Sequence, residues 1–141
     1  MPQLPLATKK VLTLDAAKQI AAAAHEEARK NRWTMAISIV DDGAHLLYLE
    51  RMDGTQIASV IVAQDKAATA VRFKRPTKAL EEAVAGGRLV VMKLAGVTPI
   101  EGGLPIVVEG EVIGGIGVSG ATGPQDSQVA AAGLAVLKAM A

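Results

Sequence analysis

The sequence contains no cysteine, and only three of its 141 residues are aromatic. Without cysteine there is no disulfide, no thiolate nucleophile and no cysteine-ligated zinc site. The formal net charge of +1 gives no electrostatic reason to expect binding to nucleic acid or to an acidic membrane surface. No apolar run reaches membrane-spanning length, and the first residues lack a basic start followed by an apolar stretch. We therefore expect a cytoplasmic protein without a secretion signal.

Half of the residues are hydrophobic, and most of that apolar volume comes from alanine, valine, leucine and isoleucine. The length suits one domain with a substantial core. Pro2 and Pro5 lie in a stretch without hydrophobic periodicity, so we expect residues 1–11 to form a loose arm and residues 12–141 to form a single domain. Alanine-rich helices offer broad apolar faces that are stable when buried against a copy. We expect a homo-oligomer, at least a dimer.

Three stretches show helical spacing, and a shorter one lies between them. The first helix begins with Thr13 as its cap and ends at Asn31. The second spans residues 57–73. Proline breaks it at Pro76, and a short third helix follows, ending at Gly86-Gly87. The last helix runs from 129 to 140 after a first turn near Pro124. The predicted apolar stripe of the second helix consists of Ile57, Val60, Ile61, Ala67, Ala68 and Val71. Gln64 lies inside this stripe, and because an unpaired buried amide is costly we expect it to bond a strand backbone or groups at a ligand cleft.

Two pairs of strand-like runs are joined by tight turns. Residues 34–40 and 46–49 flank Asp41-Asp42-Gly43, and residues 104–108 and 112–118 flank Glu109-Gly110-Glu111. Glycine supplies the positive φ angle that a tight hairpin turn needs. Residues 88–94 fit either helix or strand. Adjacent strands joined in this way predict an α+β fold, an antiparallel sheet flanked by helices.

The glycine-rich run 115–120 matches the GxGxxG pattern of dinucleotide-binding sites. Such a site also needs a following strand with an acidic residue at its end, whereas one helix follows here. We favour the interpretation that these glycines let a helix, a neighbouring chain or a ligand approach a strand. Ser119 does not form a hydrolase nucleophile elbow, because Ala121 stands where that motif needs glycine.

His25 and His45 are the only histidines, so a closed zinc site is disfavoured. His45 follows a turn and fits a solvated strand residue. His25 lies at the edge of the apolar stripe of the first helix, where a surface or interface role is the ordinary interpretation. Haem, however, needs only one axial histidine and an apolar surface. His25 is therefore a candidate metal ligand, but only as a ligand to haem iron.

Arg51 and Asp53 form a charged corner that leads into the helix carrying Lys66. One interpretation is a polar cluster of these residues with Arg72, and the other is ordinary salt bridging and helix capping. In the first case Arg51 could hold a carboxylate in two-point fashion, and Asp53 or Lys66 could move a proton. The other candidate ligand-binding residues are those whose backbone a ligand could approach, namely Gly102, Gly103, Gly117, Ser119 and Gly120.

Taken together, several stretches resemble the GlcG/HbpS-like haem-binding family, which also occurs as the C-terminal domain of PduO-type cobalamin adenosyltransferases. The resemblance covers nearly the whole chain from Leu12. Gly43-Ala44-His45 departs mildly from the Gly-Gly-His usual in the family. The matching stretches, which occur in the family's order, are 12–14, 37–46, 51–54, 65–70, 102–106, 112–121 and 125–126.

The resemblance implies a profilin-like antiparallel sheet, assembly into oligomers and, in some relatives, haem bound through a histidine of the first helix. The first hypothesis is therefore a small cytoplasmic haem-binding protein of the haem-degrading type, with His25 as axial ligand and Arg51 or Lys66 as propionate partners. The second is a cofactor-free enzyme or binding module for a small organic acid in a catabolic pathway. The third is an assembly subunit without a ligand. Fold transfers between relatives better than function does.

Overall fold

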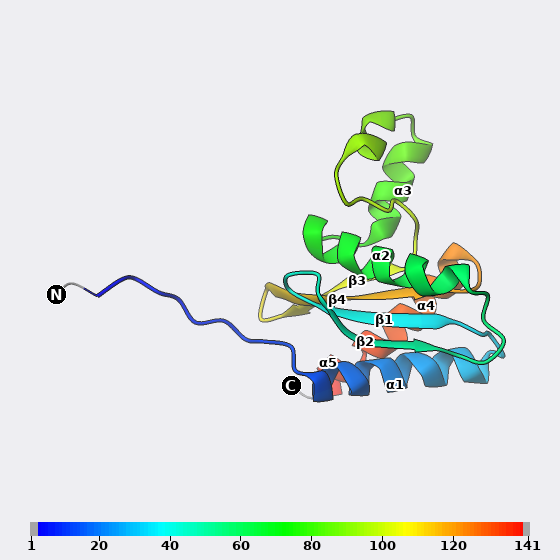
Figure 1. Ribbon diagram of the computed structural model, residues 1–141, viewed down its shortest axis with the longest axis horizontal. Helices are drawn as coiled ribbons and strands as arrows, with labels where there is room; N and C mark the ends of the chain where they lie inside the picture. Colours follow the sequence, from blue (N-terminus) through cyan, green and yellow to red (C-terminus); the bar gives the residue numbers. More distant parts are fainter. Residues whose placement is uncertain (1–2, 140–141) are drawn as a thin grey trace.

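The computed structural model describes residues 3–139, which form four strands, five α-helices and one 3₁₀ helix. Residues 3–11 lie outside helices and strands, are exposed and extend away from the body (Figure 1). The elements in chain order are α1 (Leu14–Lys30), β1 (Ala36–Asp41), β2 (Leu46–Arg51), α2 (Ala58–Phe73), α3 (Thr77–Ala85), η1 (Leu89–Lys93), β3 (Gly103–Val108), β4 (Glu111–Ser119), α4 (Gly123–Leu134) and α5 (Val136–Ala139).

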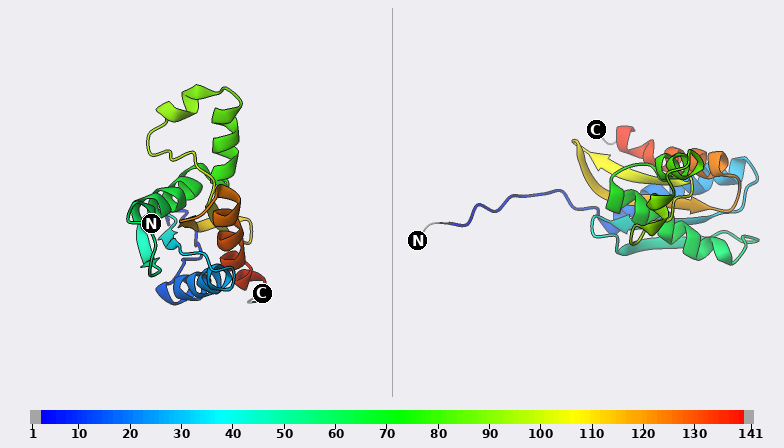
Figure 2. Two further views of the ribbon diagram at one scale, coloured as in Figure 1. Left: turned by 90° about the vertical axis from the view of Figure 1, so that its right-hand side faces the viewer. Right: turned by 90° about the horizontal axis from the view of Figure 1, so that it is seen from above.

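The strands form one antiparallel sheet in the order β2-β1-β4-β3. This confirms the predicted α+β fold and both hairpins. Helix α2 lies on one face of the sheet and α1 on the other, with α4 packed against α1 (Figures 1 and 2). Residues 88–94, whose conformation the sequence left open, contain the 3₁₀ helix η1. The predicted end of the last helix at Met140 falls outside the described residues.

The main hydrophobic core fills the space between the sheet, α1 and α4. Ile20 of α1, Ile37 of β1 and Val129 of α4 are all fully buried there. A Cβ atom added to Gly133 of α4 would lie 2.9 Å from the Ile20 carbonyl oxygen, so the two helices approach at nearly backbone distance. Thr13 accepts a hydrogen bond from the Ala16 amide, as predicted, and this fixes the start of α1.

The other face of the sheet is packed differently, because its central strand carries glycine where α2 crosses it. A Cβ atom on Gly115 would lie 2.6 Å from the Ala67 carbonyl oxygen, and one on Gly117 would collide with the carbonyl oxygen of Ala63. The interpretation that the glycines admit a close neighbour is confirmed, and the neighbour is a helix of the same chain. The GxGxxG run is a strand packed against α2.

The predicted orientation of α2 is wrong in its first half. Ile57 and Ile61 are 77% and 66% exposed, whereas Ser59 and Ala63 are buried. Only small side chains fit between the helix backbone and the glycines of β4, so the large side chains turn outward. Gln64, expected to bond a strand or a ligand cleft, donates to the Val60 carbonyl oxygen of its own helix at 3.1 Å.

Helix α3 and η1 stand away from the sheet as a projecting arm, residues 77–100 (Figures 1 and 2). The Thr77 hydroxyl joins the base of this arm to the sheet, because it accepts a hydrogen bond of 2.9 Å from the Gly103 amide. Leu80 and Val91 are the buried apolar residues between α3 and η1. The exposed large apolar residues of the arm are Leu89, Val90, Met92, Leu94 and Ile100.

Candidate functional site

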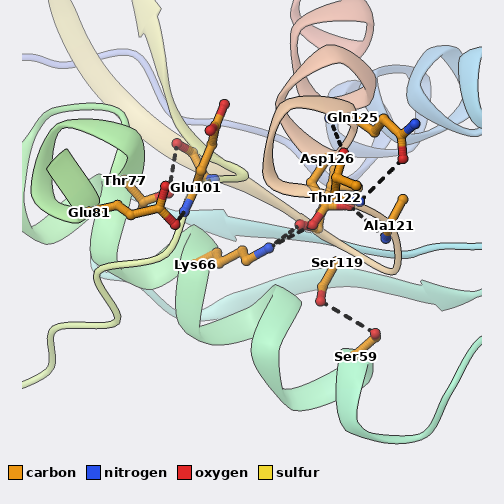
Figure 3. Close-up of polar contacts among 12 residues, drawn as sticks. Ser59, Lys66, Thr77, Glu81, Glu101, Ser119, Ala121, Thr122, Gln125 and Asp126 are labelled. Atoms are coloured by element: carbon orange, nitrogen blue, oxygen red, sulfur yellow. Dashed lines mark hydrogen bonds and ion pairs between the residues drawn. The ribbon is translucent and has the colours of Figure 1, made fainter. Parts of the chain in front are cut away.

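Lys66 is the largest fully buried side chain, with 2% exposure. Its ammonium donates to Asp126 Oδ2 and to the carbonyl oxygen of Val118, each at 2.9 Å (Figure 3). The second carboxylate oxygen of Asp126 accepts the Ala121 amide at 3.0 Å. Burial raises the pKa of Asp126 above its usual range, and the hydrogen bond from Lys66 opposes that rise. The pair joins α2, β4 and α4 and leaves the Lys66 ammonium shielded from solvent.

The glycines predicted to contact a ligand lie around this buried pair. Gly102 has a φ of +131°, and an added Cβ atom would lie 2.7 Å from Lys66 Nζ. A Cβ atom on Gly103 would clash with the Lys66 carbonyl oxygen, and Gly117 faces α2 in the same way. The close approach at these positions is therefore made by the chain itself. Gly120 lies at the exposed end of β4.

Two serines connect the sheet to the first turn of α2. The Ser119 hydroxyl at the end of β4 lies 3.3 Å from the Ser59 hydroxyl, and both residues are buried (Figure 3). Gln56 donates to the same Ser59 oxygen at 3.1 Å. The N-cap residue of α2, Ile57, offers no side-chain cap, and the first turn contains no acidic residue. The amides of Ser59 and Val60 donate to the carbonyl oxygens of Gln56 and Ile57 at 3.2 and 3.1 Å, so backbone hydrogen bonds close this turn.

The predicted polar cluster around Arg51 is not formed. Arg51 and Asp53 are exposed, and neither side chain forms an ion pair or hydrogen bond within residues 3–139. Arg72 donates instead to the Gly96 carbonyl oxygen at 3.3 Å, and Lys66 is held by Asp126. Capping by Asp53 or Thr55, the alternative, is absent too in the described structure: α2 has no side-chain cap, and the buried Thr55 hydroxyl has no hydrogen-bond partner there.

His25 lies on α1 and makes a short contact with the neighbouring edge strand. Its Nδ1 atom is 2.6 Å from Glu50 Oε2 of β2, and the two side chains are 42% and 20% exposed. The Tyr48 hydroxyl is 3.5 Å from the other Glu50 oxygen. Burial and the negative charge of Glu50 raise the pKa of Tyr48 above its usual value. An ionised carboxylate only accepts hydrogen bonds, so Nδ1 is the donor in this contact and Nε2 is the ring nitrogen that Glu50 does not engage.

The two groups of candidate residues lie on opposite faces of the sheet. Glu50 reaches His25 on the α1 side, and successive strand residues point to opposite faces, which places Arg51 on the α2 side. Lys66 belongs to α2 itself. Within one chain, the structure therefore does not bring Arg51 or Lys66 to His25. His45, the other histidine, is 82% exposed and sits 3.4 Å from Asp41 in the first hairpin turn.

Sequence reasoning missed two residues that define these sites, Glu50 and Asp126 as the partner of Lys66. A signal for the first was available, because Tyr48 and Glu50 alternate with Leu49 and Arg51 along β2. No local pattern links Lys66 to a carboxylate 60 positions later. Among the described residues, no group of three or more histidine, aspartate or glutamate side chains could hold a metal ion, and no helix is long and apolar enough to cross a membrane.

Comparison with known proteins places this geometry in a family. The family model described as haem degrading protein HbpS-like matches residues 12–135. Protein GlcG of Escherichia coli (strain K12) is 47% identical over 112 residues, covering 79% of this chain and 84% of GlcG. The crystal structure of a double mutant of Streptomyces reticuli HbpS superposes with a TM-score of 0.88 at 36% identity, covering 97% of this chain and 94% of that one. The structure of a PduOC–haem complex gives 0.81 at 30% identity, covering 89% and 94%. The chain is therefore a member of the HbpS-like family and is of the GlcG/HbpS type.

Proposed function

We propose that this protein binds haem through His25. The observation that supports the proposal is the imidazole itself, which is half-exposed on α1 and held through Nδ1 by Glu50, so that Nε2 is the atom left to bind iron. A metal-ligating histidine ordinarily gives its other ring nitrogen to a carboxylate or carbonyl in this way. The family model concerns haem degradation, and one structural neighbour is a haem complex.

The surroundings of His25 fit the group. Tyr48, whose hydroxyl lies 3.5 Å from the Glu50 partner of His25, packs against the core shared by α1 and the sheet, and haem needs such an apolar surface beside its axial ligand. Lys18 lies seven residues before His25, which is two helical turns along the same face and about 10 Å along the axis. It is the candidate propionate partner on this side of the sheet. Bound haem would supply iron-centred redox chemistry.

The test is a haem titration of the purified protein, read by the Soret band and by quenching of Trp33, the single tryptophan. We expect stoichiometric uptake by the parent protein and by His45→Ala, and loss of the ligated spectrum in His25→Ala. His45→Ala is the matched control, because it removes the other histidine from an exposed turn. Equal spectra for both variants would contradict the proposal.

A second candidate function is binding of a small organic acid, with or without catalysis. It is favoured by the guanidinium of Arg51, which is exposed and unpaired in the described structure. Arg51 would hold the carboxylate in two-point fashion, and exposed Asp53 would be the candidate base. Lys66 could take part only if its pair with Asp126 opened. A rise in melting temperature with a panel of small carboxylic acids, lost in Arg51→Ala, is the expected result.

Self-association, which the low aromatic content suggested, is supported by the projecting arm. Leu89, Val90 and Met92 are each more than 60% exposed there, and Ile57 and Ile61 at the start of α2 are exposed to the same degree. Exposed apolar residues gathered in this way are typical of interaction surfaces. We propose a homo-oligomer that buries the arm. Light scattering should give at least a dimer mass at micromolar concentration, and Leu89→Glu with Val90→Glu should lower it. The cytoplasmic location stays a prediction.

A further inference from the structure

We propose that Glu50 is the positioning residue of the haem site: its carboxylate fixes the proton of His25 on Nδ1, presents Nε2 to the iron and favours the ferric state. This inference rests on the proposed haem function. Glu50 belongs to the edge strand β2. It lies 25 residues after His25 in the sequence, and folding brings the two side chains together.

His25 and Glu50 meet at hydrogen-bonding distance. The Nδ1–Oε2 distance of 2.6 Å is that of a charge-assisted hydrogen bond. A neutral histidine side chain free in water prefers to carry its proton on Nε2, which would occupy the ring nitrogen that Glu50 does not engage. A carboxylate against Nδ1 reverses this preference, because an ionised carboxylate can accept a proton but cannot donate one. Glu50 therefore selects the tautomer that can bind a metal.

Strand pairing and a neighbouring side chain orient Glu50. Its position in the sheet is set by pairing with Ile37 of the central region, whose side chain is fully buried. The Tyr48 hydroxyl, two residues earlier on the same face, lies 3.5 Å from Oε1 and marks a weak second contact. The backbone of Glu50 is thus fixed by its pairing with Ile37, and its carboxylate contacts the Tyr48 hydroxyl. The backbone of His25 is fixed by α1. The imidazole plane is fixed between two rigid elements.

The Glu50 carboxylate brings a negative charge close to His25. Glu50 has 20% side-chain exposure, and within residues 3–139 it forms no ion pair with a lysine or arginine. A carboxylate that is partly desolvated and uncompensated acts strongly over short distances. A histidine that donates a hydrogen bond to such a carboxylate is a more basic ligand. A more basic axial ligand, together with the nearby negative charge, stabilises ferric over ferrous iron. Glu50 should therefore lower the reduction potential of the bound group.

The variants Glu50→Gln and Glu50→Ala separate the hydrogen bond from the charge. Glutamine keeps an oxygen that can accept from Nδ1 but carries no charge, whereas alanine removes both. The control is Glu26→Gln, which also removes one negative charge. Glu26 is adjacent to His25 on α1 but pairs with Arg29. Each protein is examined first without haem, by the ring ¹⁵N shifts of His25, and then with haem, by affinity and reduction potential.

We expect Nδ1–H in the parent protein, in Glu26→Gln and in Glu50→Gln, and a shift toward Nε2–H in Glu50→Ala. Haem affinity should fall about 10- to 100-fold in Glu50→Ala, less in Glu50→Gln, and the potential should rise in both. If Glu50→Ala and Glu50→Gln had the same haem affinity and reduction potential as Glu26→Gln, the inference would be overturned while haem binding stayed in place. A parent protein that takes up no haem would overturn the proposed function and, with it, the role of Glu50 at a haem site. The tautomers of the haem-free series show separately whether Glu50 fixes the proton of His25.

Discussion

Glu50 and Arg51 are neighbours in β2, yet their side chains lie on opposite faces of the sheet, one beside His25 and the other toward α2. A haem group ligated by His25 therefore cannot also be gripped by Arg51 of the same chain. The two hypotheses drawn from the sequence, haem and a small carboxylate, correspond to two separate surfaces. Substitutions on one face should leave the other intact.

Arg51→Ala should separate the two surfaces. The side chain is exposed and forms no ion pair within residues 3–139, so the melting temperature should change little. Haem affinity should stay unchanged, since His25 lies on the other face. Affinity for any small carboxylic acid that binds the parent protein should fall at least tenfold, about 1.4 kcal/mol. Both affinities are measured on one preparation by titration calorimetry. A drop in haem affinity alone would show that propionates reach Arg51, for example from a second copy.

Lys66→Met should be strongly destabilising. It leaves the Asp126 carboxylate buried without its cation, which typically costs about 3–5 kcal/mol, measured by urea unfolding. Lys78→Met is the control, because Lys78 is exposed and its pair with Glu82 spans 3.9 Å; it should cost about 0–1 kcal/mol. The double variant Lys66→Met/Asp126→Leu should recover much of the loss. A Lys66→Met protein as stable as the control would show that the pair is not needed.

The free energy of unfolding of the parent protein and of Lys66→Met should fall as pH rises through the pKa of Asp126 in the folded protein. Burial raises the pKa of Asp126 in the folded protein, so the folded state holds this proton more tightly than the unfolded chain does. The stability from this group is complete below the unfolded pKa and is lost as pH rises through the folded one. In Lys66→Met the pKa of folded Asp126 is no longer lowered by the hydrogen bond from Lys66, so the loss of stability should extend over a wider pH range, which unfolding at several pH values measures.

The sequence predicted the elements better than the contacts between them. Hairpin turns, the Thr13 cap and the antiparallel sheet depend on residues close together in the chain, and they were confirmed. The orientation of α2 could not be read from its own apolar residues. Gly115 and Gly117 decide which side chains fit beneath the helix, so Ile57 and Ile61 turn outward.

The candidate site shows the same division. The edge position of His25 on its helix followed from helical spacing, and the half-exposed ring agrees with it. Its partner Glu50 depends on how α1 crosses β2, and the partner of Lys66 depends on where α4 begins. Both are set by packing between distant segments. Sequence spacing alone therefore left open whether Lys66 joins a polar cluster with Arg51 or forms an ordinary ion pair, and it could not name Asp126 as the partner.

Gly117→Ala tests the packing of α2 on the sheet. A Cβ atom at this position would collide with the carbonyl oxygen of Ala63, so the helix must move away from β4, and overpacking of this kind costs about 1–3 kcal/mol or more. Gly86→Ala is the control: it has a φ of −79° at the end of α3, and its Cβ atom would lie 3.2 Å from the Glu82 carbonyl oxygen. Thermal unfolding should show a large loss for the first and a small change for the second. Equal losses would contradict the close approach.

The last prediction uses Tyr48, the only tyrosine of the chain, as a probe of the Glu50 carboxylate. Burial is the larger cause that raises the pKa of Tyr48, and the charge of Glu50 is the next. An ultraviolet titration of the tyrosinate band reports this one residue, and it should give a pKa above the ordinary value of about 10 in the parent protein. Glu50→Gln should lower the pKa of Tyr48 only part of the way toward that value, because the burial is kept.

Glu26→Gln is again the control. It removes a carboxylate that pairs with Arg29 on α1, so it should leave the titration of Tyr48 where it is. The experiment needs no haem, and it therefore measures the electrostatic effect of Glu50 independently of any ligand. A Tyr48 titration that is the same in Glu50→Gln and in the parent protein would mean that the Glu50 charge is screened at this face. Glu50 would then have no electrostatic influence on the donor strength of His25 either, because His25 is half-exposed on the same face.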